Sequence, residues 1–193
     1  MQPDVPGPFV MYIHEGEGDG CERVCCKQNR HLVLLIHEGT DQSADVIMQI
    51  HKSFGLAGLC CCRPSVQIFD GQANKIGHVD DPFHWCVMDQ RIYGVDGRQI
   101  YGAAGSVCQM GIFCPCLGTV EFDIAGTNGQ LTDGRISKIF GGCGEIMAGA
   151  NNFRVRFPTG ASPVEKMALI GALFLFLSSF SSFRLWVCLR CVG

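Results

Sequence analysis

An uncharged, almost entirely apolar stretch near the C-terminus, Met167 to Phe183, constrains the fold more than any other feature of this sequence. A helix start precedes it: Ser162 can cap, Pro163 suits the first helical position, and Glu165 completes a capping box. We therefore predict a helix over residues 163–186. No side of that helix is polar, so protein or lipid must enclose it. The side chains expected to make this core or membrane contact include Met167, Ile170, Leu173, Phe174 and Leu177.

The length of the stretch leaves two surroundings open. Residues 167–183 would span roughly 26 Å as a helix, against a hydrocarbon thickness of about 30 Å. Extension past Arg184 would reach that thickness if the guanidinium extended to the interface, but the serines between residues 178 and 182 weaken the hydrophobicity of this half. A helix buried in a protein core and a single membrane span both remain as interpretations.

Composition indicates one folded domain. The chain has 193 residues and a net charge of -3, with 47% hydrophobic and 17% charged residues, which excludes disorder and does not indicate a nucleic-acid site. We predict a short disordered leader over residues 1–9, a domain over 10–187 and a tail over 188–193. Met1 to Pro8 lacks the basic and apolar regions of a secretory signal, so we place the bulk of the chain in the cytosol.

Short apolar segments separated by turn residues precede the helix, and they predict strands. Apolar and charged residues alternate from Val120 to Ile124 and from Phe153 to Phe157, as in strands with one wet face. The pairs at Gly71, Gly97, Gly129 and Gly134, each with a preceding Asp or Asn, predict tight hairpins. We expect about ten strands, at residues 10–13, 32–36, 46–50, 66–69, 76–79, 83–88, 100–103, 120–124, 136–140 and 153–157.

These segments predict a mainly β fold, an antiparallel barrel or sandwich, because many short strands occur before a single helix. A sheet of this size needs something to fill its interior, and one apolar helix of matching length is a natural filler.

The 13 cysteines need an explanation other than disulfides, because the cytosol keeps thiols reduced. Three consecutive cysteines, Cys60, Cys61 and Cys62, cannot all direct sulfur at one tetrahedral zinc ion without strain. S-acylation asks only for exposed thiols near a membrane, and a triplet suits it. Cys86, Cys108 and Cys143 fit the simpler interpretation of small buried apolar residues.

No catalytic machinery is visible in the sequence. The histidines are spread over different predicted strands and turns, the carboxylates are scattered, and no serine lies in a nucleophile elbow, so we predict that the protein is not an enzyme. Arg154 and Arg156 share one strand face, where they could contact anionic lipid phosphates or simply face water.

Several motifs together resemble the phospholipid scramblase family, over roughly Val10 to Phe183. The most specific are Gly134-Arg135-Ile136-Ser137-Lys138 and the run from Asn152 through Pro158, followed by Lys166-Met167 and Ile170-Gly171-Ala172. The remaining matches are residues 19–26 with their C-x-x-x-C-C, the triplet 60–62, residues 76–79 and residues 114–122.

This resemblance implies a Tubby-like closed β-barrel around a hydrophobic C-terminal helix, which the family also treats as a membrane span. It implies calcium-triggered, ATP-independent, bidirectional movement of membrane phospholipids between leaflets, at the cytosolic face of the plasma membrane. It implies palmitate on Cys60, Cys61 and Cys62, and either homo-oligomers or signalling partners. The alternative is a lipid-anchored binding or signalling module without transport activity, whose helix is only core.

Two departures from the family pattern bear on these expectations. The family's calcium loop aligns with Gly149 to Gly160, where acidic positions have become Gly149, Asn151 and Gly160. Asn151 and Asn152 are the remaining side-chain oxygen ligands, so we expect weak or absent calcium binding. The chain also aligns from about the third family strand onward, which predicts an incomplete barrel with an unpaired edge and a slot that exposes the helix.

Overall fold

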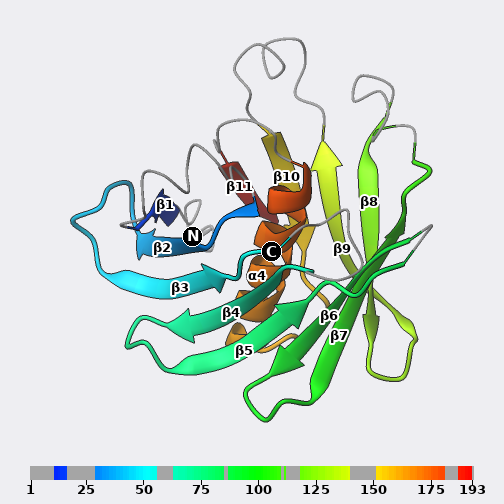
Figure 1. The fold of residues 1–193 in the computed structure, drawn as a ribbon, viewed down its shortest axis with the longest axis horizontal. Coiled ribbons are helices and arrows are strands. Elements are labelled where there is room, and N and C mark those ends of the chain that lie inside the picture. The colour runs from blue at the N-terminus through cyan, green and yellow to red at the C-terminus, as the bar shows by residue number, and fades with distance from the viewer. Residues whose placement is uncertain are drawn as a thin grey trace, which may run out of the picture.

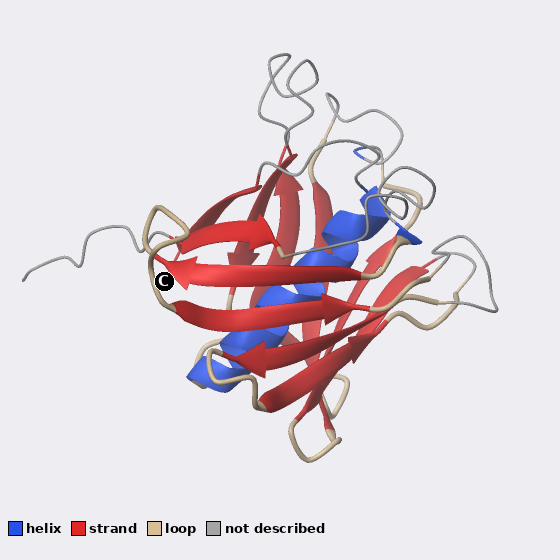
Figure 2. Ribbon diagram, turned by 60° about the vertical axis from the view of Figure 1, so that its left-hand side comes forward, coloured by secondary structure: helices blue, strands red, loops and turns tan. Residues whose placement is uncertain are grey.

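The computed structural model describes residues 11–16, 29–55, 63–84, 87–109, 111, 118–139, 151–180 and 187–192. One sheet contains every described strand, and a single long helix, α4 (Pro163–Phe180), lies within its curve (Figures 1 and 2). The strands are β1 (Met11–Glu15), β2 (Leu32–Glu38), β3 (Val46–Lys52), β4 (Ser65–Asp70), β5 (Lys75–Asp80), β6 (Val87–Gly94), β7 (Gln99–Ser106), β8 (Val120–Gly126), β9 (Leu131–Ile139), β10 (Asn151–Arg156) and β11 (Val187–Val192).

The strands follow one another in the sheet in the order of the sequence. Each neighbouring pair from β1 to β10 is antiparallel, whereas β10 and β11 are parallel. Within the described residues no pairing joins β1 to β11, so the sheet is not closed into a barrel. The predicted mainly β, antiparallel fold around a C-terminal helix is confirmed, and the closed barrel of the family resemblance is not observed. The segment 188–193 that we expected to be a tail supplies most of β11.

Side chains alternate between the two faces of the sheet as predicted. On β8, Val120, Phe122 and Ile124 are at most 1% exposed, while Glu121 faces solvent. The inward residues of β1 to β7, β9 and β10 join the same core, because a strand sends every second side chain to the same face. The core therefore lies between the concave face of the sheet and α4.

Two of the four predicted glycine turns adopt left-handed backbone, at Gly97 (φ 72°) and Gly129 (φ 74°). In the β4–β5 turn the positive φ falls on Ala73 instead of Gly71. The hairpin predicted at Gly134 is wrong, because this residue lies inside β9. A side chain there would place its Cβ 2.8 Å from Cδ of Pro158, so glycine is needed for close approach rather than for turning.

The strand predicted at residues 83–88 is misplaced: β6 begins at Val87 and continues to Gly94. Its inward positions include Gln90 and Ile92, both at most 1% exposed. A polar residue at a core position interrupts the apolar alternation, which is why the sequence pattern missed most of this strand.

The predicted capping box of α4 is confirmed. The Ser162 N–H donates to the Glu165 carboxylate over 2.7 Å, and the Glu165 N–H donates to the Ser162 hydroxyl over 3.3 Å. The helix is described to Phe180, and residues 181–186 of the predicted helix lie outside the described residues.

Protein encloses α4 in this structure. Its side chains from Ala168 to Leu177 are buried, with Leu169, Leu173 and Leu175 at 0% exposure. The slot that we expected to expose the helix does not uncover these residues. Within the described part of the chain, no helix has both the length and the hydropathy needed to cross a bilayer.

Candidate functional site: the cysteine-bearing end and the basic strand

The meander places the connections that follow β1, β3, β5, β7 and β9 at one end of the sheet, since each of these strands ends there and its successor begins there. The short turns at the other end contain no cysteine, whereas those connections contain most of the cysteines of the chain. The cysteines in the connections are Cys21, Cys25, Cys26, Cys60, Cys61, Cys62, Cys86, Cys108, Cys114, Cys116 and Cys143. The segments that contain these cysteines are far apart in the sequence, but the strand ends that flank them lie at a single end of the sheet. We call it the cysteine-bearing end.

The flanks of the predicted acylation segment are held together. The Ser53 N–H donates to the Ser65 carbonyl over 2.8 Å, and the two hydroxyls are 3.2 Å apart. Gly55 lies so close to Pro64 that an added Cβ would be 2.5 Å from its Cα. Cys60, Cys61 and Cys62 themselves lie outside the described residues. The described flanks show a narrow, hydrogen-bonded base beneath the segment that carries them.

A partly buried ion pair connects this base to the segment that follows β5. An Arg63 guanidinium nitrogen is 2.6 Å from an Asp81 carboxylate oxygen, and Arg63 also donates to the Asp81 carbonyl over 2.9 Å. Burial raises the pKa of Asp81, and the bond and charge of Arg63 oppose that rise. The Arg63 guanidinium also lies 5.9 Å from the ring centroid of Phe83. By contrast, Phe54, beside the same base, is 52% exposed.

Lys52 ends β3 in a buried position, only 3% exposed. Its ammonium donates to the carbonyls of Arg30 and Ser53, over 3.3 and 3.5 Å. Burial, with a smaller effect from the charge of Arg30, lowers the pKa of Lys52 to about 8. Arg30 itself pairs with Glu15 over 2.6 Å. Arg30, Lys52 and Arg63 at this end are therefore engaged by protein groups.

The segment aligned with the family's calcium loop contains a strand. Residues 151–156 form β10, in which Phe153 and Val155 point into the core and are 2% exposed. Asn151 and Asn152 are consecutive residues of an extended strand and not of a loop. A hard cation needs several oxygen ligands converging on one point, which this extended backbone does not provide. The described residues contain no group of three or more His, Cys, Asp or Glu side chains that could hold a metal ion.

Arg154 and Arg156 lie on the outer face of β10 and are exposed. Within the described residues neither forms an ion pair, whereas Arg135 on β9 is held by Glu121 and Asp123 over 2.8 and 2.9 Å. The structure therefore places Arg154 and Arg156 on one exposed face of the strand, where Arg156 also interacts electrostatically with Asp133.

Sequence reasoning missed Gln90, the buried polar side chain that contacts α4. With the side-chain amide assigned so that its NH2 and its oxygen each face a complementary group, the NH2 donates to the Ala172 carbonyl over 3.0 Å and the oxygen accepts from the Phe176 N–H over 3.2 Å. Apart from this contact, the core around the helix consists of apolar side chains in the described part of the chain. Its sequence neighbours Asp89 and Arg91 are charged, so the local sequence shows no sign that Gln90 occupies a core position.

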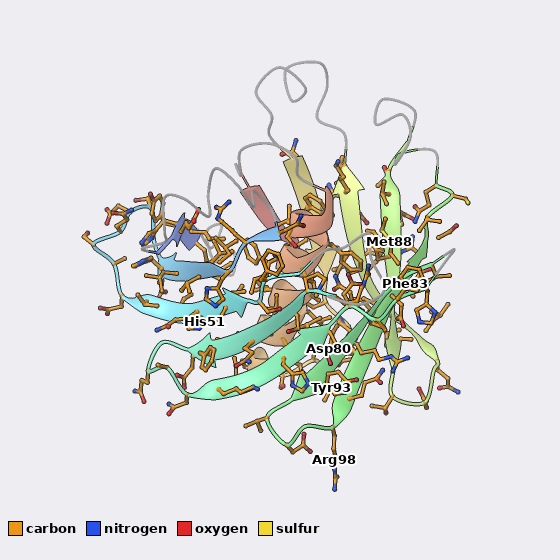
Figure 3. All side chains as sticks on the ribbon, in the orientation of Figure 1. His51, Asp80, Phe83, Met88, Tyr93 and Arg98 are labelled. Carbon is orange, nitrogen blue, oxygen red and sulfur yellow. The ribbon has the colours of Figure 1, made fainter. Side chains whose placement is uncertain are left out.

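The six histidines do not form a catalytic constellation in the described structure. His14 and His37 stack with ring centroids 5.0 Å apart, His51 packs on Phe69 at 4.6 Å, and His78 stacks on Tyr93 at 4.4 Å. Figure 3 shows His51 and Tyr93 on separate strands. These ring contacts explain His14, His37, His51 and His78 as packing partners on the sheet, while His84 lies 3.3 Å from the Asp89 carboxylate.

Comparison with known proteins gives one consistent result. The Scramblase family model matches residues 3–182. The chain is 27% identical to human phospholipid scramblase 1, covering 86% of this chain and 51% of that protein, and 28% identical to human phospholipid scramblase 2, covering 86% and 54%. It is 29% identical to human phospholipid scramblase family member 5, covering 86% and 60%.

The chain thus spans between about half and three fifths of the length of these relatives. No solved structure gives a significant match. The family model covers nearly all of the described strands and the whole of α4, from β1 to Phe180. On this match, the chain belongs to the Scramblase family.

Proposed function

We propose that this protein redistributes phospholipids between the leaflets of a membrane, acting from the cytosolic face. The observation that carries the proposal is the family match over residues 3–182. Proteins of this family are in general lipid transporters and not catalytic enzymes. A transport role also agrees with a fold whose exposed arginines and cysteine-bearing end can meet a bilayer.

In this proposal the molecule lies with both its cysteine-bearing end and the outer face of β10 toward the membrane, and acyl chains on Cys60, Cys61 and Cys62 anchor it there. A single acyl chain anchors only marginally, whereas two or more anchor stably. Support comes from the narrow base at Ser53 and Ser65 and from the neighbouring Phe54, which is 52% exposed.

The outer face of β10 supplies the headgroup contact in this proposal. A lysine or arginine near an anionic leaflet contributes about 1 kcal/mol, so Arg154 and Arg156 together would strengthen binding by roughly 30-fold. The apolar core around α4 contains no row of polar groups in its described part. We infer that headgroups move along the outside of the protein and not through this core.

Leaflet exchange of labelled phospholipid in vesicles containing the purified, acylated chain tests the proposal. We expect exchange well above that of protein-free vesicles, with no dependence on micromolar calcium. If exchange stays at the protein-free rate although the protein is bound, the chain is instead a lipid-anchored binding or signalling module.

A second measurement isolates the headgroup contact. Arg154→Gln with Arg156→Gln should weaken binding to phosphatidylserine vesicles and leave the weaker binding to phosphatidylcholine vesicles unchanged. Arg98→Gln is the matched control, because this 87%-exposed arginine lies at the tip of the β6–β7 turn, away from β10 (Figure 3). Equal losses in the double variant and the control would refute a specific role for β10.

A further inference from the structure

Gln90 is a polar side chain held inside an apolar core against α4. It is 1% exposed and lies on β6 opposite Ala103 of β7, which is itself fully buried. Its amide, oriented so that each polar group meets a complementary partner, makes the two hydrogen bonds to Ala172 and Phe176. The amide is thereby satisfied at a site that water does not reach.

The two backbone groups that Gln90 binds belong to one i, i+4 pair of the helix. In a regular α-helix the N–H of residue 176 and the carbonyl of residue 172 are partners, four residues apart. Gln90 therefore binds both members of one backbone carbonyl and N–H pair from the side of the helix. Because a hydrogen bond requires a defined distance and angle, this contact constrains both the depth and the rotation of the helix.

Apolar packing by itself does not supply that constraint. Hydrophobic burial is non-directional, and α4 is apolar on every side from Met167 to Leu177. The other buried polar or charged side chains in the described part of the chain have partners away from the helix. His37 contacts the Ala44 carbonyl, Lys52 donates to the Arg30 carbonyl, and Asp81 pairs with Arg63.

Every i, i+4 carbonyl and N–H pair of the helix backbone presents the same two groups, so a second contact must determine which pair Gln90 binds. Gly171 supplies it: a Cβ at this position would lie 2.4 Å from Cδ1 and 2.8 Å from Cγ1 of Ile68 on β4. Gly171 is the single glycine of α4. A helix advanced by one residue along its own screw would satisfy Gln90 but would bring a side chain against Ile68.

We propose that Gln90 is the positioning residue of α4. Together with Gly171, it fixes one depth and one rotation of the helix inside the sheet, whereas apolar packing alone would be compatible with several depths and rotations. An apolar replacement of similar volume would keep the helix inside the sheet and remove the selection. Polar groups buried for structural specificity are known in other folds, where they set register.

The test is Gln90→Met in the full chain, with Gln90→Leu as a second variant. Gln67→Met is the matched control, because Gln67 is an exposed residue on β4. We expect both Gln90 variants to unfold cooperatively. Amides of residues 167–180 should exchange with deuterium at least tenfold faster than in the unsubstituted chain, and Ile68 and Phe176 should give more than one set of NMR signals.

Three results would overturn the proposal. One is a single set of signals with unchanged protection of α4 in both Gln90 variants. Another is the same loss of protection in Gln67→Met. The third is failure of both Gln90 variants to fold, which would mean that the amide contributes general stability and not a choice between helix positions.

Discussion

The ring of Phe122 on β8 stacks on the ring of Phe176 on α4, with centroids 3.9 Å apart and planes inclined by 23°. Both side chains are at most 2% exposed. This contact joins β8 to the helix, whereas Gly171 approaches Ile68 on β4.

Replacing Phe176 by Ala should lower the free energy of unfolding by about 3–5 kcal/mol, because it removes buried apolar area and leaves a cavity. Phe122→Ala should have a similar effect, and a double-mutant cycle should show a coupling of about 0.5–1.5 kcal/mol for the stacked pair. Urea unfolding measures all three. Phe54→Ala is the control and should change stability by less than about 0.5 kcal/mol, since Phe54 is 52% exposed.

Gly171→Ala should destabilise the chain by about 1–3 kcal/mol through overpacking against Ile68, although alanine is intrinsically favoured over glycine in helices by about 1 kcal/mol. Adding Ile68→Val removes the Cδ1 atom that would lie 2.4 Å away and should recover part of the loss. Thermal unfolding of the single and double variants checks this. A Gly171→Ala variant more stable than the unsubstituted chain would contradict the close contact.

Lys52 should make stability rise with pH in the alkaline range. Its pKa is lowered from 10.5 to about 8, so between these values the unfolded chain binds the proton more tightly than the folded chain. The resulting penalty is fully present below pH 8 and disappears as pH rises toward 10.5. Urea midpoints of the unsubstituted chain and Lys52→Met, compared at matched pH, isolate this residue from the thiols. A difference that does not vary with pH would refute a buried, charged Lys52.

Replacing Cys60, Cys61 and Cys62 together by Ser should move the protein from the membrane to the soluble fraction after a carbonate wash. The reason is that α4 is enclosed by protein and acyl chains would be the main anchor. Hydroxylamine, which cleaves thioesters, should have the same effect on the unsubstituted chain. Cys108→Ser is the control, since Cys108, which we expected to be buried, is an exposed free thiol at the same end. Full membrane retention of the triple variant would show that another element anchors the chain.

Calorimetric titration should show no saturable binding at micromolar calcium. Residues 151–156 form a strand in which Phe153 and Val155 face the core, so ligand positions of a loop become buried apolar positions. Saturable binding that disappears in Asn151→Ala with Asn152→Ala would contradict this prediction.

Local patterns in the sequence were sufficient for most of the secondary structure. The capping box of Ser162 and Glu165 and the strict alternation of β8 depend on neighbours a few residues apart, so they could be predicted and are confirmed. The shared face of Arg154 and Arg156 follows from the same two-residue period. Gly134 was misjudged because a tight approach to Pro158, distant in sequence, and not a local turn, requires glycine there.

Only the tertiary structure decided what surrounds α4. Apolar side chains favour protein and lipid alike, so the sequence left a core helix and a membrane span open. The deciding contacts come from β4, β6 and β8, through Ile68, Gln90 and Phe122, which lie far from the helix in the chain. Hydrogen-bond geometry and steric fit are properties of two surfaces brought together. The periodicity of a single segment contains no information on hydrogen-bond geometry or steric fit, so the role of Gln90 could be recognised only in the folded structure.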